Sequence, residues 1–207
     1  MKLRDLEIRL ERLEGLSYPS VKLEQYPTPA PLAARMLYDA FMRGDIEGKR
    51  VLDPGAGTGV LAIGASLLGA SEVIAVEVDP DAVSVAERNT LHTGTDVHYI
   101  TSDVKRACLS EELGMFDTAV MNPPFGAQNA HADRPFLDLA LRTANVTYGI
   151  FNAGSREFIN GYIRGRGTIS DAIGGKCSLK RTFSFHRKDR LEINVEILRI
   201  VREPDSP

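Results

Sequence analysis

Cysteine is scarce in this sequence, and its two copies suggest neither a metal site nor a disulfide framework. Cys108 and Cys177 stand outside any metal-binding spacing. We therefore expect no bound metal and a reducing, cytoplasmic location. No apolar run approaches the roughly 20 residues that a membrane-spanning helix needs, so we expect no membrane partner. The N-terminus alternates charges with leucines, which is unlike a signal peptide.

Negative charge prevails along most of the chain, with one exception. The formal net charge is −3 over 207 residues, and residues 1–150 contain 14 Lys and Arg against 21 Asp and Glu. Residues 151–190 reverse this balance, with nine basic and three acidic residues. Such a segment can be a solvated loop, but a basic segment on an acidic protein also fits a surface that binds nucleic acid.

A glycine-rich loop stands at the centre of the sequence. A short apolar run ends at Asp53, glycines follow at positions 55, 57 and 59, and residues 60–68 are apolar enough for a helix. Glycines allow positive φ and close approach of a ligand to the backbone, and the first N–H groups of a helix face that ligand. The pattern predicts a nucleotide-like ligand at the carboxyl end of a strand.

The identity of that ligand depends on the loop's details. Residues 57–62 fit the G-x-G-x-x-A dinucleotide fingerprint, which is weak alone, and no Lys-Ser/Thr pair ends the loop as in a P-loop. The loop resembles the D-x-G-x-G-x-G loop of class I S-adenosylmethionine (SAM) methyltransferases, and a carboxylate suits a cofactor that carries an ammonium group. On this interpretation Asp53, Gly55, Ala56, Gly57 and Gly59 bind SAM.

Acidic residues follow the next two predicted strands. Residues 72–80 are a buried type of strand that ends in acids, and a carboxylate there can accept both hydroxyls of a ribose. Glu77, with Val78 beside it, stands at the position that does this in class I methyltransferases. Asp79 precedes Pro80 and fits a helix N-cap. Asp103 follows a short strand at 97–100, and an Asp there commonly accepts the adenine amino group of SAM in this fold.

The N-terminal segment is predicted to cover the cofactor. Leucines at helical spacing predict a helix at residues 2–14, and Pro31 fits the first turn of a second helix with Thr28 or Ala30 near its cap. The prolines between them favour extended backbone. Composition alone favours a rigid linker, but a similar Gln-Tyr-x-Thr-Pro stretch precedes the glycine loop in several amino-methyltransferases. We therefore interpret Gln25, Tyr26 and Thr28 as a lid.

The chemistry is predicted where a central strand, residues 116–121, ends in Asn122-Pro123-Pro124-Phe125. This motif resembles the [D/N]-P-P-[F/Y/W] motif of methyltransferases that act on exocyclic or side-chain amide nitrogens. The Asn122 side-chain oxygen and the Pro123 carbonyl can accept the two protons of a planar NH₂ group, on a backbone that two prolines fix. Phe125 can stack on a flipped base. No general base stands out, and His131 is interpreted as solvated.

The C-terminal third is predicted to complete the sheet. A strand at 146–151 is followed by a helix at 156–164 with Ser155 as its cap, and the alternating runs 183–186 and 191–200 fit an antiparallel hairpin. Residues 165–178 match no pattern. We expect a single α/β domain over residues 1–207, with N-terminal helices and lid at 1–45 and a catalytic core at 46–207. Its class I methyltransferase Rossmann-like fold has seven mostly parallel strands, an antiparallel C-terminal hairpin strand and helices on both faces.

Taken together, the Gln-Tyr-Pro-Thr-Pro stretch, the glycine loop, the Asn-Pro-Pro-Phe-Gly motif and the segment 183–188 resemble the methyltransferase-like 5 family in its archaeal form. The resemblance implies methylation of N6 of one adenosine in small-subunit ribosomal RNA. It also implies a small zinc-binding activator protein that docks by strand pairing along the sheet edge. With RNA as the substrate, Arg187, Lys188 and Arg190 could contact its phosphates.

Other functions remain open at this point. Guanine-N2 methylation of rRNA is the first alternative, because Asn-Pro-Pro-Phe occurs there too. Glutamine-N5 methylation of protein fits less well, since that group typically has Tyr at the position of Phe125. A SAM-binding partner protein without catalysis is a different class, and nothing supports it while Asn122 is intact. A nicotinamide oxidoreductase would leave the motif unexplained.

Overall fold

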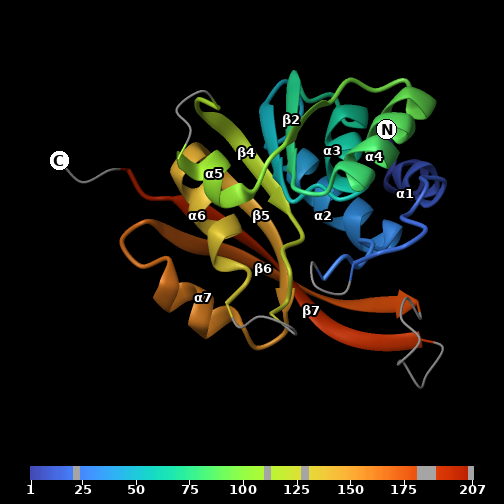
Figure 1. The fold of residues 1–207 in the computed structure, drawn as a ribbon. Helices are drawn as coiled ribbons and strands as arrows, with labels where there is room; N and C mark the ends of the chain where they lie inside the picture. The colour runs from blue at the N-terminus through green and yellow to red at the C-terminus, as the bar shows by residue number, and fades with distance from the viewer. Residues whose placement is uncertain (21–23, 110–112, 127–130, 181–189, 205–207) are drawn as a thin grey trace.

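A seven-stranded sheet forms the centre of the computed structural model, which describes residues 1–20, 24–109, 113–126, 131–180 and 190–204 (Figure 1). Within these ranges the side chains of residues 109, 177–180 and 190–192 lie outside the description. The strand order is β3-β2-β1-β4-β5-β7-β6. Five strands pair in parallel: β1 (Arg50–Pro54), β2 (Glu72–Glu77), β3 (His98–Thr101), β4 (Phe116–Met121) and β5 (Ala144–Asn152).

The strand order reverses at β1, because β1 pairs with β2 on one side and with β4 on the other. Parallel strands need crossover connections. Four helices provide them: α3 (Val60–Leu67), α4 (Pro80–Thr93), α5 (Val104–Leu109) and α6 (Arg134–Thr143). Loops at such a reversal leave a crevice at the carboxyl edge of the sheet. The glycine loop follows β1 and the Asn-Pro-Pro-Phe motif follows β4, so the two motifs face each other across that crevice.

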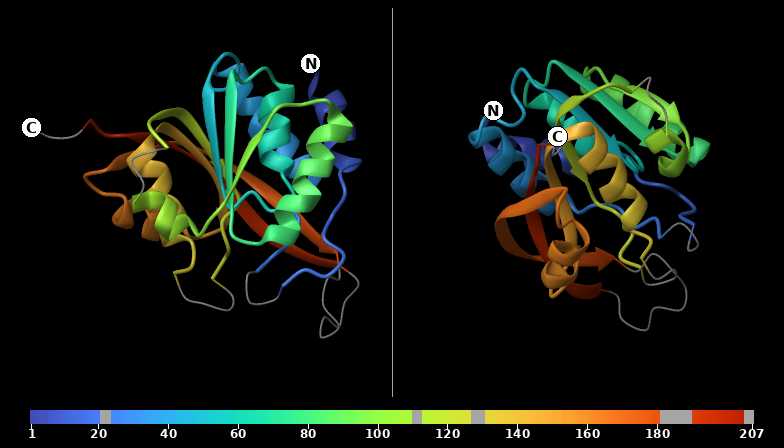
Figure 2. Two further views of the ribbon diagram at one scale, coloured as in Figure 1. Left: turned by 45° about the horizontal axis from the view of Figure 1, so that its top comes forward. Right: turned by 90° about the vertical axis from the view of Figure 1, so that its left-hand side faces the viewer.

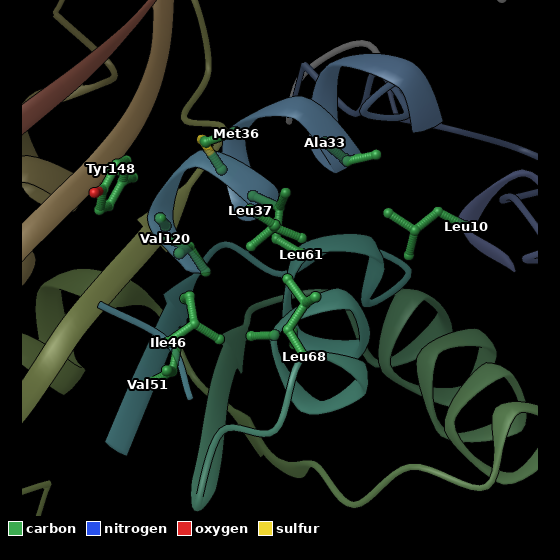
Figure 3. Close-up of a cluster of buried hydrophobic side chains, with 14 of the residues drawn as sticks. Leu10, Ala33, Met36, Leu37, Ile46, Val51, Leu61, Leu68, Val120 and Tyr148 are labelled. Atoms are coloured by element: carbon green, nitrogen blue, oxygen red, sulfur yellow. The ribbon is translucent and has the colours of Figure 1, made fainter. Parts of the chain in front are cut away.

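Helices cover both faces of the sheet (Figures 1 and 2). On one face pack α1 (Leu3–Glu11), α2 (Ala30–Met42) and α3, and on the other α5, α6 and α7 (Arg156–Tyr162). Successive strand residues point to opposite faces, so Val51 of β1 belongs to the first core cluster and Leu52 to the second. Figure 3 shows Leu37 of α2 and Leu61 of α3 in the cluster of Val51.

The sheet ends in a long antiparallel pair that differs from the predicted hairpin. Strand β6 (Gly167–Lys180) pairs with β7 (Arg190–Arg202), and β7 lies between β5 and β6. The partner of the last strand is thus the segment that matched no pattern. The sequence did not predict this strand, because its glycines and polar residues hide the alternation and its pairing with β7 is non-local. The predicted strand at 183–186 lies outside the described residues.

Three helices begin where the sequence predicted, although only one of their caps makes a side-chain hydrogen bond. Asp79 is the N-cap of α4, and its Oδ1 accepts a hydrogen bond from the Asp81 N–H at 2.9 Å. The N-cap of α2 is Pro29, so Thr28 and Ala30 flank the cap as predicted, and Pro31 lies in the first turn. Ser155 occupies the N-cap position of α7 without a side-chain hydrogen bond.

The predicted fold class is confirmed, with β7 as the antiparallel strand of a sheet that is otherwise parallel in direction. Among the described residues, no helix has both the length and the apolar character to cross a membrane.

Candidate functional site

A cavity of about 580 Å³ opens at the carboxyl ends of β1, β2 and β4. The N-terminal segment, the glycine loop, the ends of β2 and β4, and the start of α6 all contribute to its wall. Most of the predicted cofactor-binding residues line it: Gln25, Tyr26, Thr28, Gly55, Ala56, Gly57, Glu77, Val78, Asp103 and Asn122. Two of them, Asp53 and Gly59, do not. The structure therefore gathers residues from distant parts of the chain around one space.

Two glycines of the loop are required by close packing as well as by backbone conformation. Gly55 has φ +80°, and a Cβ there would come within 2.5 Å of the Phe136 ring. Gly59 has φ +85° at the N-cap of α3, and a Cβ there would meet the Tyr99 hydroxyl at 2.5 Å. The N–H groups of Gly55 and Ala56 both donate to the Val76 carbonyl, at 2.7 and 3.1 Å. These contacts hold the loop against β2.

Glu77 fastens the glycine loop to the end of β2. Its side chain accepts hydrogen bonds from the backbone N–H groups of Gly57 at 2.7 Å, Val78 at 2.9 Å and Asp79 at 3.0 Å. The residue is 7% exposed and lines the cavity. A carboxylate has about four acceptor sites, so this one retains capacity for a ligand hydroxyl. Its role toward a ribose stays a prediction.

Asp53 lies behind the glycine loop and does not reach the cavity. It is 1% exposed, its Oδ2 accepts the Ala62 N–H of α3 at 3.0 Å, and its Oδ1 is buried without a hydrogen-bond partner. Burial raises the pKa of Asp53 to about 8, with a smaller contribution from the charge of Glu77. This arrangement therefore provides no direct contact between Asp53 and a cofactor ammonium group. The side chain instead anchors the start of α3.

The N-terminal segment contributes to the cavity wall and is hydrogen-bonded to residues at the ends of β2 and β4, and its role as a lid stays a prediction. Gln25 Nε2 donates to Asp79 Oδ2 at 2.6 Å, and Gln25 Oε1 accepts the Ser20 N–H at 2.6 Å. Asp79 therefore both caps α4 and holds the lid. Thr28, at the other end of this segment, accepts a hydrogen bond from Asn122.

Asn122 presents an unpaired acceptor at the end of β4. Its Nδ2 donates to the Thr28 hydroxyl oxygen at 3.0 Å, whereas its Oδ1 is buried and has no hydrogen-bond partner. A buried polar atom without a partner costs roughly 1–3 kcal/mol. The site therefore favours a ligand that donates an N–H or O–H to Oδ1.

The rest of the motif is divided between the cavity and the core. Pro124 lines the cavity, and Pro123 is buried. Phe125 is half-buried against the first core cluster and does not line the cavity. The stacking role predicted for Phe125 stays a prediction. The predicted RNA-binding residues Arg187 and Lys188 lie outside the described residues, as does the side chain of Arg190, the first residue of β7.

Sequence reasoning missed several residues of the wall, among them Lys105, His131 and Phe136. The sequence contained one indirect indication of Phe136, the glycine at position 55, because the Phe136 ring leaves no room for a side chain there. His131 is exposed, as interpreted, but it also lines the cavity and stacks on Phe158 with ring centroids 5.6 Å apart. Asp103 lines the cavity while its Oδ1 accepts the Lys105 N–H at 2.8 Å.

Metal ligands are not clustered in the part of the chain that the structure describes. Its side chains include no group of three or more His, Cys, Asp or Glu residues placed to hold a metal ion.

Comparison with known proteins gives one family match and several relatives over nearly the whole chain. Residues 35–122 match the family model of ribosomal protein L11 methyltransferase (PrmA). The chain is 35% identical to rRNA N(6)-adenosine-methyltransferase Mettl5 of Drosophila melanogaster over 96% of each chain. It is 34% identical to an uncharacterized protein of Methanocaldococcus jannaschii over 97% of this chain and 94% of the other.

One solved structure is also similar in sequence. It is that of a Pyrococcus horikoshii protein with the provisional name of RNA methyltransferase, 41% identical, covering 98% of both chains with a TM-score of 0.89. The family match covers the part of the chain from α2 to Asn122, whereas these relatives also cover the C-terminal strand pair.

Proposed function

The chain belongs to the METTL5-like family of class I SAM-dependent methyltransferases, and from that premise we propose that it methylates N6 of an adenosine in small-subunit ribosomal RNA. It is a SAM-dependent RNA methyltransferase. The choice of adenosine, of N6 and of the small-subunit RNA is our proposal. The Drosophila relative, which is named for N6-adenosine methylation of rRNA, supports the first two choices.

One observation carries the proposal. Asn122 holds a buried acceptor oxygen without a partner at the cavity wall, while its amide nitrogen is engaged by Thr28. An exocyclic NH₂ group is a donor that satisfies this oxygen. A substrate hydroxyl group could also donate to this oxygen, but it has only one proton. An NH₂ group has a second proton, which a carbonyl of the rigid Pro-Pro backbone can accept.

The residues around the cavity fit SAM. Backbone conformation and packing keep side chains off the glycine loop, so a ligand can approach its main chain. Glu77 and Asp103 place carboxylates in the cavity wall as acceptors for hydroxyl and amino groups, and Gln25, Tyr26 and Thr28 contribute to the wall of the same space. When bound, SAM supplies an activated methyl group on its sulfonium.

The protein's own contribution is to position and orient the acceptor nitrogen. Asn122 Oδ1 accepts one N–H of the amino group, which draws the nitrogen toward a pyramidal geometry with its lone pair directed at the methyl group. Thr28 holds the Asn122 amide through its hydroxyl oxygen, which accepts a hydrogen bond from Nδ2 and leaves Oδ1 without a partner. Most of the rate acceleration should come from this positioning and from the water-poor site. The proton lost after transfer passes to water.

An activator subunit is also part of the proposal. Strand β3 pairs with β2 alone among the described strands, so its outer edge can accept a further strand. Leu91 of α4, the helix that packs beside β3, is 84% exposed. A small zinc-binding protein that adds a strand to β3 would cover such apolar surface.

The test is methyl transfer from labelled SAM to purified archaeal small-subunit rRNA, followed by nucleoside analysis by mass spectrometry. N6-methyladenosine is the expected product, and Asn122→Ala is the control that should give none. N2-methylguanosine would keep SAM and the Asn122 mechanism but replace the base. A methyl group on protein and none on RNA, with SAM still bound, would overturn the RNA assignment.

A further inference from the structure

Three aromatic rings form a stack beside the cavity. The His131 and Phe158 rings are 5.6 Å apart with planes 16° from parallel, and the Phe158 and Tyr162 rings are 6.2 Å apart and 14° from parallel. His131 precedes α6, whereas the other two belong to α7. Phe158 is 42% exposed although it is a large apolar residue. We refer to His131, Phe158 and Tyr162 as the ring stack.

An arginine whose only described counter-charge is the neighbouring carboxylate of Asp133 lies on this stack. The Arg134 guanidinium is 5.2 Å from the Phe158 ring centroid and 5.1 Å from that of Tyr162. Its side chain makes no hydrogen bond or ion pair with any residue that the structure describes, and its Nε is buried without a partner. The rings therefore fix the orientation of this cation, while its terminal nitrogens are left for an anion from outside.

A neighbouring arginine shows the contrast. Arg166 lies 4.8 Å from the Tyr162 ring centroid, but it pairs with Asp138 at 2.7 Å and donates to the Tyr162 carbonyl at 3.0 Å. Asp138 also accepts the Tyr162 hydroxyl at 2.9 Å. The charge of Arg166 is thus used in an ion pair that holds Tyr162 in place. Arg134 is attracted by Asp133 but makes no ion pair or hydrogen bond with the described residues.

The ring stack is continuous with the cavity. His131 and Ala132 line the cavity just before Arg134 in the sequence, and Pro135 and Phe136 line it just after. Asn122 and Pro124 line the same cavity. A chain that inserts one nucleotide toward Asn122 would therefore pass its neighbouring phosphate and bases over Arg134 and the ring stack.

Charge favours a nucleic-acid occupant over an acidic protein. Residues 131–166 contain five arginines against three carboxylates, on a chain whose net charge is −3. Proteins that bind single-stranded nucleic acids use aromatic rings together with arginines, because every base has a π-face and every linkage has a phosphate. A peptide carboxylate could pair with Arg134, but it would leave the exposed Phe158 ring without a partner.

We propose that Arg134 and the ring stack bind the single-stranded RNA next to the target adenosine, with Arg134 on a phosphate and a neighbouring base against the exposed rings. The inference rests on the proposed function, since it takes RNA as the substrate. It adds a surface, built by α6 and α7, that is separate from the segment containing Arg187 and Lys188.

The test measures binding of an oligo(A) RNA of about 12 nucleotides, a usual site size for a single strand, at several salt concentrations. Arg134→Gln, Arg134→Lys and Phe158→Leu are compared with Arg142→Gln, which makes the same charge change at an exposed position later in α6. SAM affinity and melting temperature show that each variant is folded.

Arg134→Gln should lower the salt slope by about 0.7, the value for one phosphate contact on a single strand, and Arg134→Lys should retain it. Phe158→Leu should weaken binding roughly tenfold at an unchanged slope, because stacking does not depend on salt. Arg142→Gln should bind like the wild type. Equal binding by all variants, equal losses in all, or no binding by the wild type would overturn the proposal.

Methylation assays on the same variants distinguish a wrong surface from a wrong substrate. If the wild type methylates rRNA while the variants of the ring stack do so with unchanged KM, the surface is wrong and the proposed function stands. If the wild type methylates no RNA, the proposed function itself fails. If the variants of the ring stack lose binding to poly-glutamate but bind RNA like the wild type, the surface binds an acidic protein and the RNA proposal is overturned.

Discussion

The side chain of Asn122 donates a hydrogen bond from Nδ2 to the hydroxyl oxygen of Thr28 over 3.0 Å. This contact joins the lid to the end of β4, and it determines which end of the amide faces the cavity. Because the hydroxyl oxygen engages the nitrogen, the oxygen of Asn122 is left as the acceptor. The position of the N-terminal segment and the orientation of the acceptor group are therefore linked by one hydrogen bond.

Replacement of Thr28 by Val should lower kcat roughly tenfold, the effect of losing one hydrogen bond worth about 1.4 kcal/mol. Val preserves the shape but offers no acceptor, so the Asn122 amide can turn. Thr28→Ser keeps the hydroxyl and should retain most of the activity. Steady-state kinetics with SAM and rRNA measure both variants. Equal kcat values for Val and Ser would show that the hydrogen bond does not orient the amide.

Replacement of Asn122 by Ala should abolish methyl transfer and leave SAM affinity close to that of the wild type. The change removes the acceptor for the substrate amino group, while the other residues expected to hold SAM are untouched. Single-turnover assays with labelled SAM measure the first effect, and calorimetry measures the second. Asn145→Ala, at an exposed position of β5, is the control. Wild-type turnover in Asn122→Ala would refute the mechanism.

Contiguous motifs explain most of what the sequence predicted correctly. The glycine loop, Glu77 and Asn122 each follow a strand of the parallel sheet, so their positions at the carboxyl edge follow from local sequence and from the fold rule. Asp53 belongs to the same motif but faces away from the cavity. Strand geometry accounts for this, because Asp53 shares a face with Val51, the face that α3 covers.

Long-range packing determined what the sequence did not predict. Strand β6 contains glycines and polar residues, and only its register with β7 makes it a strand. Phe136 and His131 line the cavity, and the α7 rings of the stack lie beside His131, because α6 and α7 pack on the same face of the sheet, which no local pattern records. Phe125 packs against the core, and its neighbour in the motif, Pro124, faces the cavity instead.

Replacement of Glu77 by Ala should weaken SAM binding by roughly 1–3 kcal/mol, the cost of leaving buried hydrogen-bonding groups unpaired. The structure adds that the same change frees the backbone N–H groups of Gly57, Val78 and Asp79, so thermal stability should fall too. Calorimetry with SAM and with its 2′-deoxyribose analogue separates the two effects. If Glu77 binds the ribose, the mutation should cost the analogue less than it costs SAM. Equal losses would leave Glu77 with a loop-holding role alone.

Asp53 should make the protein less stable as the pH rises from about 4 to about 8. Its pKa is raised to about 8 in the folded protein and is about 3.9 in an unfolded chain. Between these values the folded state binds the extra proton, so the free energy of unfolding falls with increasing pH and levels off above pH 8. The fall from this residue is at most about 1.4 kcal/mol per pH unit.

Asp53→Asn should remove that slope and stabilise the protein above pH 8, because the amide mimics the protonated carboxyl and still accepts the Ala62 N–H. Urea unfolding from pH 5 to pH 9 measures the effect. Asp96→Asn, at an exposed position, is the matched control and should keep the wild-type pH profile. If Asp53→Asn keeps the wild-type pH profile, Asp53 is ionised in the folded protein.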